Sequence, residues 1–569
     1  MKTTLMLAAV IGTLGGAGSA LAKGGACPNP DFAAQARSAI KAFVDADVFS
    51  GVVLVAVDGR PVLREGVGLA DRELGVPNRP DFKFRIGSNT KQFTATAILQ
   101  LQEAGKLSID DPVSRYYPAA PASWARITIK DLLTHTSGIP SYTGIPGFFQ
   151  GPARLPHTPE ELIRLTQDKP LEFEPGTKFA YDNSGYILLG YIIEKVSGQP
   201  YADYVKGHII GPLGMTSSGY DFSGEIIPGR AKGYQPGPLG GWRNADYLDM
   251  SVPYAAGSLY STVDDLLKWD QALYAGRPLT AASLKAMFTD YGHHYGFGWS
   301  IDQKWGHDRI WHNGGINGFV SSFQRYPKDG VTAVVLSNET AGAPDKLAAD
   351  LAGLCLGAQV YPTTLALSPQ ALSAFAGYYF APPSTVTRME ERDGTLVSHP
   401  PGQPPLTFYP EGKGKFFAKT DDVEVTFQTD ANGKVIGATV RANGQEFHSK
   451  PIEEAEAERI TAEMAARATA GVASPGTEAA LRQMIDQIAR GQPDYGRMNP
   501  VLADAMRSQL AAVQSLLIQM GPLKSVDFQG VGAGGADIFI VTFDKGRLEG
   551  RIALGEGGPI EGLTFRPAP

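Results

Sequence analysis

The chain has 569 residues, of which 43% are hydrophobic and 19% charged, and its formal net charge is −7. This composition is typical of a folded globular protein, and the length exceeds what a single hydrophobic core supports, so we expect several domains. The acidic balance argues against a nucleic-acid partner, because such a protein needs a basic face to neutralise phosphates.

The first residues have the pattern of an export signal. Lys2 supplies a positive start, residues 5–14 form an apolar run, and Ala20-Leu21-Ala22 places small residues where a signal peptidase reads them. We expect 1–22 to be a signal peptide, cleaved after Ala22, and the mature protein to be periplasmic or secreted. The alternative is an N-terminal membrane anchor. Because the run is short and interrupted by glycines, we expect no stable membrane anchor.

The chain has two cysteines, Cys27 and Cys355. A pair of cysteines in an oxidising compartment can form one disulfide. Cys27 precedes an amphipathic helix predicted at 31–44, and Cys355 lies near the end of a helix predicted at 344–356. If these helices pack antiparallel, the two sulfurs meet. The alternative, that Cys355 is simply a small core residue, stays open.

The pattern near the N-terminus predicts a hairpin followed by a long helix. A β-rich run at 52–57 is followed by Asp58-Gly59, a two-residue turn signal, and then by a returning strand. After Ser88, apolar residues recur at helical spacing until Gly105, which is expected to end the helix.

Two further strands are expected at 319–326 and 331–338, after a region at 107–290 that mixes short helices with glycine- and proline-rich loops. Strands at both ends with helices between them indicate one α/β unit whose terminal segments share a sheet. We place this unit at 23–360.

After Pro369 the pattern changes to short β-rich runs separated by turn signals: Asp393-Gly394, Asn432-Gly433 and Asn443-Gly444. Such a pattern predicts an antiparallel meander, here a small β-barrel at 366–452. A charged, alanine-rich stretch at 453–471 is expected to be a linker, with a helix as one form that it can take. The segment 472–569 predicts two helices followed by about four strands, which makes a third, α+β unit.

A candidate nucleophile stands at the start of the predicted long helix. In Gly87-Ser88-Asn89-Thr90-Lys91 a serine precedes a lysine by three positions, and residues i and i+3 share one face of a helix. A serine hydroxyl is a weak nucleophile, and a lysine can accept its proton only if its pKa is lowered. The Ser-x-x-Lys spacing alone is a weak signal, because it occurs by chance in long proteins.

Two other motifs strengthen this interpretation. Tyr181-Asp182-Asn183 follows Pro175-Gly176 and precedes a helical run, so a phenol and an amide lie on a loop held by a helix. Trp311-His312-Asn313-Gly314-Gly315 leads into the strand at 319–326. Its glycines let backbone N–H groups come close to a ligand.

The order of these motifs and the residues within them resemble those of the serine β-lactamase and penicillin-binding-protein superfamily, in particular its class C-like branch. The resemblance covers about residues 35–358 and implies a β-lactamase/transpeptidase-like main domain, α/β (α+β), with an antiparallel sheet and a helical subdomain. It rests on several agreements together: 87–93 (Gly-Ser-Asn-Thr-Lys-Gln-Phe), 132–138 (Leu-Leu-Thr-His-Thr-Ser-Gly), 175–176 (Pro-Gly), 181–186 (Tyr-Asp-Asn-Ser-Gly-Tyr), 256–262 (Ala-Gly-Ser-Leu-Tyr-Ser-Thr) and 312–314 (His-Asn-Gly).

The resemblance implies a role for each catalytic residue. Ser88 attacks a carbonyl and forms an acyl-enzyme, while Lys91 and Tyr181 share the abstracted proton and return it to the leaving group. Asn183 is expected to orient Lys91 and the substrate amide.

The resemblance also implies an oxyanion hole made by the backbone N–H groups of Ser88 and Gly315, with Gly314 in the substrate-binding strand. His312 stands where many members have the lysine of a Lys-Thr-Gly triplet. Histidine has an ordinary pKa of about 6.5, so we expect only a partial charge at neutral pH. A substrate carboxylate should then be held less firmly, which favours esters, amides or peptides with a free amino end over β-lactams.

Two other polar residues in these motifs have alternative interpretations. Asp182 either favours an amine-bearing substrate or points away from the site, and we favour the second. His135 is expected to brace its loop through hydrogen bonds. The remaining histidines near His312 have no Glu or Cys at metal-ligand spacing, so we predict no metal site.

We predict an exported serine hydrolase that cleaves amide or ester bonds of a small-molecule or peptide substrate, without a cofactor. The alternatives are a true β-lactamase or D-Ala-D-Ala carboxypeptidase, and a non-catalytic penicillin- or peptide-binding sensor, which would not need Tyr181. The segment 366–452 resembles the lipocalin-like barrel often appended to these hydrolases. It either restricts access to the site or only stabilises the protein, and the oligomeric state is left open.

Overall fold

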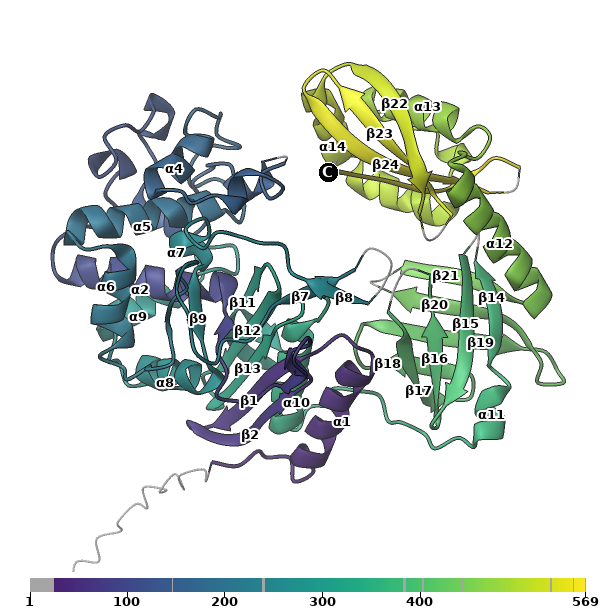
Figure 1. The fold of residues 1–569 in the computed structure, drawn as a ribbon, viewed down its shortest axis with the longest axis horizontal. Coiled ribbons are helices and arrows are strands. Elements are labelled where there is room, and N and C mark those ends of the chain that lie inside the picture. Colours follow the sequence, from purple (N-terminus) through teal and green to yellow (C-terminus); the bar gives the residue numbers. More distant parts are fainter. Residues whose placement is uncertain are drawn as a thin grey trace, which may run out of the picture.

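The computed structural model describes residues 25–145, 147–237, 241–381, 385–401, 404–442, 445–532, 535–555 and 557–567. The expected signal peptide and the turn predicted at 443–444 lie outside the described residues. Figure 1 shows a mixed α/β body, a barrel drawn in green, and a terminal body of helices and yellow strands. None of the helices in the described ranges is long and apolar enough to cross a membrane.

An antiparallel sheet of six strands forms the centre of the first body, in the order β10-β11-β12-β13-β1-β2. β1 pairs with β13 along its whole length, from Gly51 opposite Ser337 to Val57 opposite Val331. The prediction that the two terminal segments share one sheet is therefore confirmed. The strand bounds are β1 Gly51–Val57, β2 Arg60–Val67, β10 Ser300–Lys304, β11 His307–Ile316, β12 Phe319–Tyr326 and β13 Val331–Ser337.

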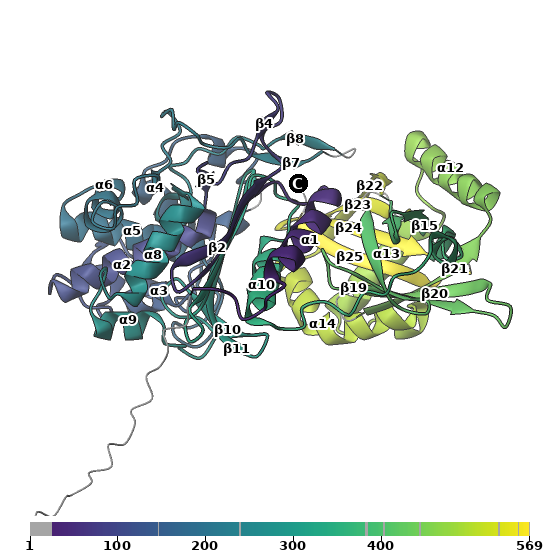
Figure 2. The same cartoon turned by 90° about the horizontal axis from the view of Figure 1, so that it is seen from below.

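Helices cover both faces of this sheet, as Figure 2 shows. On one face, Val53 and Val55 of β1 pack in a core with α1 (Phe32–Asp45) and α10 (Pro344–Leu356). On the other face, Val52 and Leu54 pack in the larger core that contains the helical region. Because successive strand side chains point to opposite faces, a strand covered on both sides is a continuous apolar run.

The helical region is built around α2 (Thr90–Glu103), which is buried on nearly all sides and packs against α5 (Asn183–Ser197). Its other helices are α3 Ile129–Leu133, α4 Pro159–Gln167, α6 Tyr201–Val205, α7 Tyr254–Gly257, α8 Val263–Tyr274 and α9 Ala281–Met287. Short strands complete this part: β3 Leu69–Asp71, β4 Val76–Pro77, β5 Phe84–Arg85, β6 Gly219–Tyr220, β7 Tyr234–Pro236, β8 Trp242–Asn244 and β9 Leu259–Ser261.

A disulfide joins Cys27 and Cys355, whose Cα atoms lie 4.8 Å apart. It ties the segment before α1 to the last turn of α10, on the outer side of the sheet. The structure therefore contains the disulfide that helix packing suggested, and Cys355 is at the same time a fully buried core residue.

The second body is a closed barrel of eight antiparallel strands, completed by pairing of β14 with β21. The predicted barrel is confirmed, and its interior is aromatic, with Phe408, Phe416 and Phe427 in one core. That it is lipocalin-like stays a prediction. Its elements are α11 Pro369–Ser373, β14 Gly377–Ala381, β15 Thr385–Arg392, β16 Thr395–His399, β17 Leu406–Gly412, β18 Lys415–Ala418, β19 Val423–Thr429, β20 Val435–Ala442 and β21 Gln445–Ile452.

The terminal body packs two helices on a four-stranded antiparallel sheet, as expected for an α+β unit. The stretch predicted to be a linker is the helix α12 (Glu454–Ala470). Asp537 of the sheet is fully buried and accepts hydrogen bonds from Arg467 of α12 and from Thr477. The other elements are α13 Thr477–Ala489, α14 Pro500–Met520, β22 Leu523–Val531, β23 Asp537–Phe543, β24 Gly546–Leu554 and β25 Ile560–Pro567. The domain limits stay predictions.

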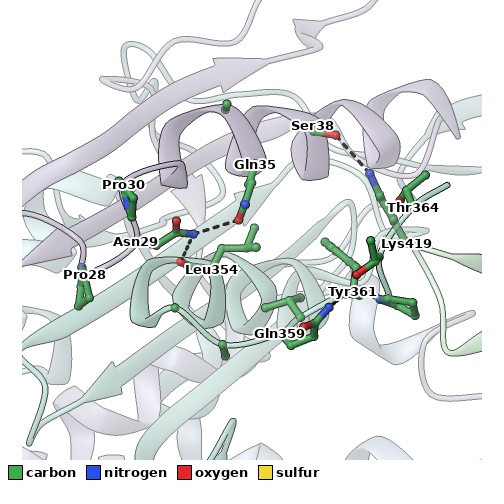
Figure 3. Close-up of a pocket in the computed structure, with 16 residues that line it drawn as sticks. Pro28, Asn29, Pro30, Gln35, Ser38, Leu354, Gln359, Tyr361, Thr364 and Lys419 are labelled. Atoms are coloured by element: carbon green, nitrogen blue, oxygen red, sulfur yellow. Dashed lines mark hydrogen bonds between the residues drawn. The ribbon is translucent and has the colours of Figure 1, made fainter. Parts of the chain in front are cut away.

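The barrel meets the first body on the α1–α10 side. Lys419 of the barrel donates a hydrogen bond to Ser38 of α1 at 3.2 Å, and Phe417 stacks on Tyr361. A pocket of about 810 Å³ lies between α1, residues 357–364 and Lys419 (Figure 3). Because α1 covers the sheet face opposite to α2, this contact favours a stabilising role for the barrel over control of access to the predicted site.

Candidate active site

Ser88 lies at the entrance to the central helix. Residues Gly87–Asn89 form a short 3-10 turn that leads into α2, and Ser88 is half-buried there. Gly87 has a φ of +51°, and a Cβ on it would lie 2.9 Å from the Gly315 nitrogen of β11. Gly87 therefore supplies both a left-handed backbone conformation and the space that lets β11 approach Ser88.

The two predicted glycines of β11 have different surroundings. A Cβ on Gly314 would lie 1.9 Å from the Ile86 carbonyl oxygen, whereas a Cβ on Gly315 would meet no atom within 4 Å. Gly314 thus lets the strand pack closely against the turn that contains Ser88. Ser88 and Gly315 line the same pocket, which has a volume of about 420 Å³. The structure brings both predicted oxyanion-hole residues together there.

Lys91 is fully buried, and its amine faces Ser88. Its Nζ lies 3.2 Å from Ser88 Oγ and donates to Asn183 Oδ1 at 2.8 Å and to the Ala256 carbonyl at 3.0 Å. Burial lowers the pKa of Lys91 to about 7, and the charge of Asp182 acts in the opposite direction. Near neutral pH part of the population is therefore a free amine, which can accept a serine proton.

Tyr181 completes the group around Ser88. Its ring centroid lies 4.8 Å from Lys91 Nζ. Desolvation raises the pKa of the Tyr181 phenol above its ordinary value, while a hydrogen bond with Ser88 lowers it. The side chain is 40% exposed, so water reaches part of the ring. Near neutral pH the phenol is therefore protonated and can donate a proton.

Asp182 and Asn183 begin α5, and they point in different directions. The Asn183 amide donates to Thr143 Oγ1 at 3.2 Å and its oxygen holds Lys91, so it lines the pocket. Asp182 is the N-cap of α5: its buried carboxylate accepts from the Gly185 N–H at 3.1 Å. Asp182 therefore points away from the pocket, as favoured from the sequence. Burial raises its pKa to about 7.

His312 differs from the sequence-based expectation of a partial charge at neutral pH. It is 3% exposed, its Nε2 lies 2.9 Å from Tyr295 Oη and its Nδ1 lies 2.6 Å from the Asn313 carbonyl oxygen. Burial and the nearby charge of Lys91 lower the pKa of His312 to about 3, so the ring is neutral. It lies beside Tyr181, behind the pocket wall, and its predicted substrate-binding role stays a prediction.

His135 braces the loop of Tyr181 from both sides. Its carbonyl oxygen accepts from the Ala180 N–H at 3.0 Å, and its ring Nδ1 accepts from the Asp182 N–H at 3.1 Å. Its ring also lies 4.3 Å from the ring of Tyr181. These are the bracing contacts expected from the sequence.

Tyr295 is the site residue that the sequence analysis missed. It is buried, and its hydroxyl lies between the rings of His135 and His312. The sequence did hold one signal, because Tyr295 begins the aromatic and glycine-rich segment 295–299. In the structure, a Cβ on Gly298 of this segment would lie 2.7 Å from the Lys91 carbonyl oxygen. This segment therefore packs directly against the start of α2.

The pocket that Ser88 lines has no charged side chain among its described lining residues. Its walls include Phe149, Leu248 and Val252, together with the amides of Gln235 and Asn317. The larger pocket beside Lys419 is on the other side of the sheet, and its serine and lysine, Ser38 and Lys419, come from α1 and the barrel instead of from one helical turn. Over the described ranges, no three His, Cys, Asp or Glu residues gather in a way that could hold a metal ion.

The beta-lactamase family matches residues 36–357, more than half of the chain. The chain belongs to the beta-lactamase family. It is 37% identical over 290 residues to the Bacillus subtilis (strain 168) relative described as penicillin-binding protein PbpX, in an alignment that covers 51% of this chain and 70% of the relative. The predicted resemblance is confirmed, and the chain is a hydrolase-family member of the serine β-lactamase and penicillin-binding-protein type.

Solved structures extend this comparison of the beta-lactamase-family fold. The octameric penicillin-binding protein homologue from Pyrococcus abyssi is 25% identical, with a TM-score of 0.55, over 73% of this chain and 99% of that one. The D-amino acid amidase from Ochrobactrum anthropi SV3 is 27% identical, with a TM-score of 0.50, over 54% of this chain and 91% of that one. The predicted fold class is therefore confirmed.

Proposed function

We propose that this protein is an exported serine hydrolase that cleaves amide or ester bonds through an acyl-enzyme on Ser88. The observation that carries the proposal is the position of the fully buried Lys91 amine, 3.2 Å from Ser88 Oγ and held by Asn183. A buried amine with a pKa of about 7 is a general base suited to neutral pH.

In the acylation step, Ser88 Oγ bonds to the substrate carbonyl carbon while its proton passes to the Lys91–Tyr181 pair. The carbonyl oxygen takes up the negative charge and faces the N–H groups of Ser88 and Gly315, whose dipoles stabilise it. When the intermediate collapses, the bond to the leaving amine or alcohol breaks, and the leaving group receives the proton from the same pair. An ester on Ser88 remains.

In the deacylation step, water takes the place of the leaving group. It bonds to the acyl carbon and gives a proton to the Lys91–Tyr181 pair. The bond to Ser88 Oγ then breaks, the serine oxygen regains a proton, and the carboxylic acid leaves. The pair therefore acts as base and then acid in each half of the cycle.

The lining of the pocket favours a substrate that has no charged group next to the bond that is cleaved. The described lining has no cation for a carboxylate and no carboxylate for an amine, and His312 behind it is neutral. A β-lactam or a terminal D-Ala residue has a carboxylate that would find no charged partner, so both alternatives are disfavoured. The likeness to a D-amino acid amidase supports an amide as one substrate type.

The test compares wild type and Ser88→Ala on a p-nitrophenyl ester, nitrocefin, and D-alanine p-nitroanilide with its amino group free or acetylated. We expect wild type to hydrolyse the ester and the acetylated anilide at least as well as the free-amine anilide. We expect Ser88→Ala to lose at least about 10³-fold in kcat/KM. Lys91→Met should lose a similar factor.

Each of the other results would count against a part of the proposal. Turnover of nitrocefin alone would indicate a true β-lactamase. A stable acyl adduct on Ser88 without turnover of any substrate would indicate a sensor. Equal activity of wild type and Ser88→Ala would remove Ser88 as the nucleophile.

The localisation is part of the same proposal. The signal-like residues 1–22 and the disulfide between Cys27 and Cys355 both suit an oxidising compartment outside the cytoplasm. Expression of the full chain in a bacterium, followed by cell fractionation and N-terminal sequencing, should find mature protein outside the cytoplasm that begins at Lys23. An uncleaved cytoplasmic product would contradict the proposal.

A further inference from the structure

The hydroxyl of Tyr295 joins two histidines that are far apart in the chain. His312 Nε2 lies 2.9 Å from Tyr295 Oη, and His135 Nε2 lies 3.3 Å from the same oxygen. All three side chains are buried, at 3% exposure or less. Tyr295 therefore connects the loop that carries Tyr181, which His135 braces, to the strand β11.

The partners of the two rings fix the direction of the hydrogen bonds that join these rings to Tyr295. The Asp182 N–H can only donate, so His135 Nδ1 is unprotonated and the ring proton is on Nε2, facing Tyr295. At the other end, the Asn313 carbonyl can only accept, so the proton of His312 is on Nδ1 and Nε2 is unprotonated. Tyr295 then accepts from His135 and donates its one proton to His312.

We propose that Tyr295 is a positioning residue, whose hydroxyl holds His135 and His312 in opposite neutral tautomers and so fixes the Tyr181 loop against β11. This inference rests on the proposed function, because it assigns the purpose of the group to the placement of Tyr181 beside Ser88 and Lys91. A proton added to His312 Nε2 would face the proton that Tyr295 donates, and one added to His135 Nδ1 would break the bond from the Asp182 N–H.

The backbone of His135 supports a positioning role. His135 has a φ of +57°, a left-handed conformation that few residues other than glycine adopt. Strain of this kind persists where the surrounding structure holds it, and it is common next to functional groups. Here the same residue accepts hydrogen bonds from the backbone on both sides of Tyr181.

The groups that face the two rings oppose their protonation. Lys91 of α2 lowers the pKa of both histidines, and His312 further lowers that of His135; burial is the largest cause in each case. The other titratable neighbours are the phenols of Tyr181 and Tyr186 and the N-cap carboxylate of Asp182. The phenols are protonated near neutral pH, and the Asp182 carboxylate is turned toward the Gly185 N–H.

The first test reads the tautomers directly and needs no substrate. Wild-type protein is labelled with ¹⁵N-histidine, and long-range ¹H–¹⁵N spectra are recorded between about pH 5 and pH 8, with His135→Asn and His312→Gln used for assignment. We expect His135 to show the Nε2–H tautomer and His312 the Nδ1–H tautomer, unchanged over this range. In Tyr295→Phe at least one of the two signatures should be lost or should begin to titrate.

The second test uses kinetics on the ester that wild type hydrolyses. We expect Tyr295→Phe to lower kcat about tenfold with KM changed less than about twofold, because the pocket wall is intact and only the Tyr181 loop is loosened. The matched control is Tyr326→Phe, which removes a buried hydroxyl from the opposite face of the sheet. It should lower the melting temperature without the change in kcat.

The results separate the inference from the proposed function. A charged His312 at neutral pH, the opposite tautomers, or unchanged spectra and kcat in Tyr295→Phe would overturn the inference, whatever the enzyme hydrolyses. If no substrate is turned over, the spectra alone still decide it. If Tyr295→Phe does not fold, the wild-type tautomers decide it, because a group without the predicted directions cannot act as proposed.

Discussion

The fully buried amine of Lys91 lies 3.2 Å from the hydroxyl of Ser88, and burial brings the pKa of Lys91 to about 7. Since only the free amine can accept a proton, the rate should fall as pH drops below this pKa and Lys91 becomes charged. We expect kcat/KM for a neutral ester to fall about tenfold per pH unit below pH 6. The phenol of Tyr181, whose pKa is raised, should limit the rate only at high pH. A flat profile from about pH 5 to pH 10 would exclude Lys91 as the base.

Asp182 should set the pH of the acidic limb of this profile, the range in which the rate falls as Lys91 becomes charged. Its charge raises the pKa of Lys91, so Asp182→Asn should lower this pKa and move the acidic limb to lower pH. Asparagine is also a good N-cap, so the fold should remain stable. Asp182→Ala removes the cap as well and should cost about 1 kcal/mol of unfolding free energy. Denaturant unfolding and pH profiles measure the two effects separately. A limb that moved to higher pH in Asp182→Asn would contradict the assignment.

His312→Lys should change which substrates are accepted. The neutral histidine offers no charge to a carboxylate, whereas lysine would place an amine near the pocket, and a hydrogen bond to a charged group contributes about 1.5–3 kcal/mol. We therefore expect kcat/KM for nitrocefin to rise about tenfold or more relative to that for the neutral ester. The ratio of the two, measured on the same preparation, controls for the amount of active enzyme. An unchanged ratio would show that this position does not determine the preference.

Substitutions at Gly314 and Gly315 test how closely β11 packs, because the two glycines are adjacent and only one of them lacks space for a Cβ. A Cβ on Gly314 would overlap the Ile86 carbonyl, so Gly314→Ala should shift the nucleophile turn and lower stability by about 1–3 kcal/mol. Gly315→Ala adds its Cβ to open space and should leave the melting temperature nearly unchanged. Thermal unfolding of both variants measures the difference. Equal melting temperatures would show that the strand can move away from the turn.

The disulfide should stabilise the first body. It closes a loop with a sequence separation of 328 residues, and cross-links of this kind contribute up to about 5 kcal/mol. Reductant should lower the melting temperature of wild type and leave Cys27→Ser/Cys355→Ser unchanged. Thiol titration of denatured protein should find free thiols only after reduction. Equal titres before and after reduction would mean that the bond does not form.

Much of the site could be predicted because its contacts are encoded locally. The i, i+3 spacing of Ser88 and Lys91 places both on one face of a helix, and a phenol next to an N-cap has a fixed place at the start of α5. The charge state of His312 could not be predicted, because it depends on burial by segments distant in the chain. Tyr295 was missed for the same reason: its two partners come from residues 135 and 312, and no local pattern links them.

The pairing of β1 with β13 has a consequence for how the protein is synthesised. β1 is synthesised early, but its partner is complete only at Ser337, after the whole helical region. Until then the apolar strand Gly51–Val57 has an open edge, which is a template for association with other chains. A nascent chain stopped before β13 should therefore be inactive and prone to aggregation.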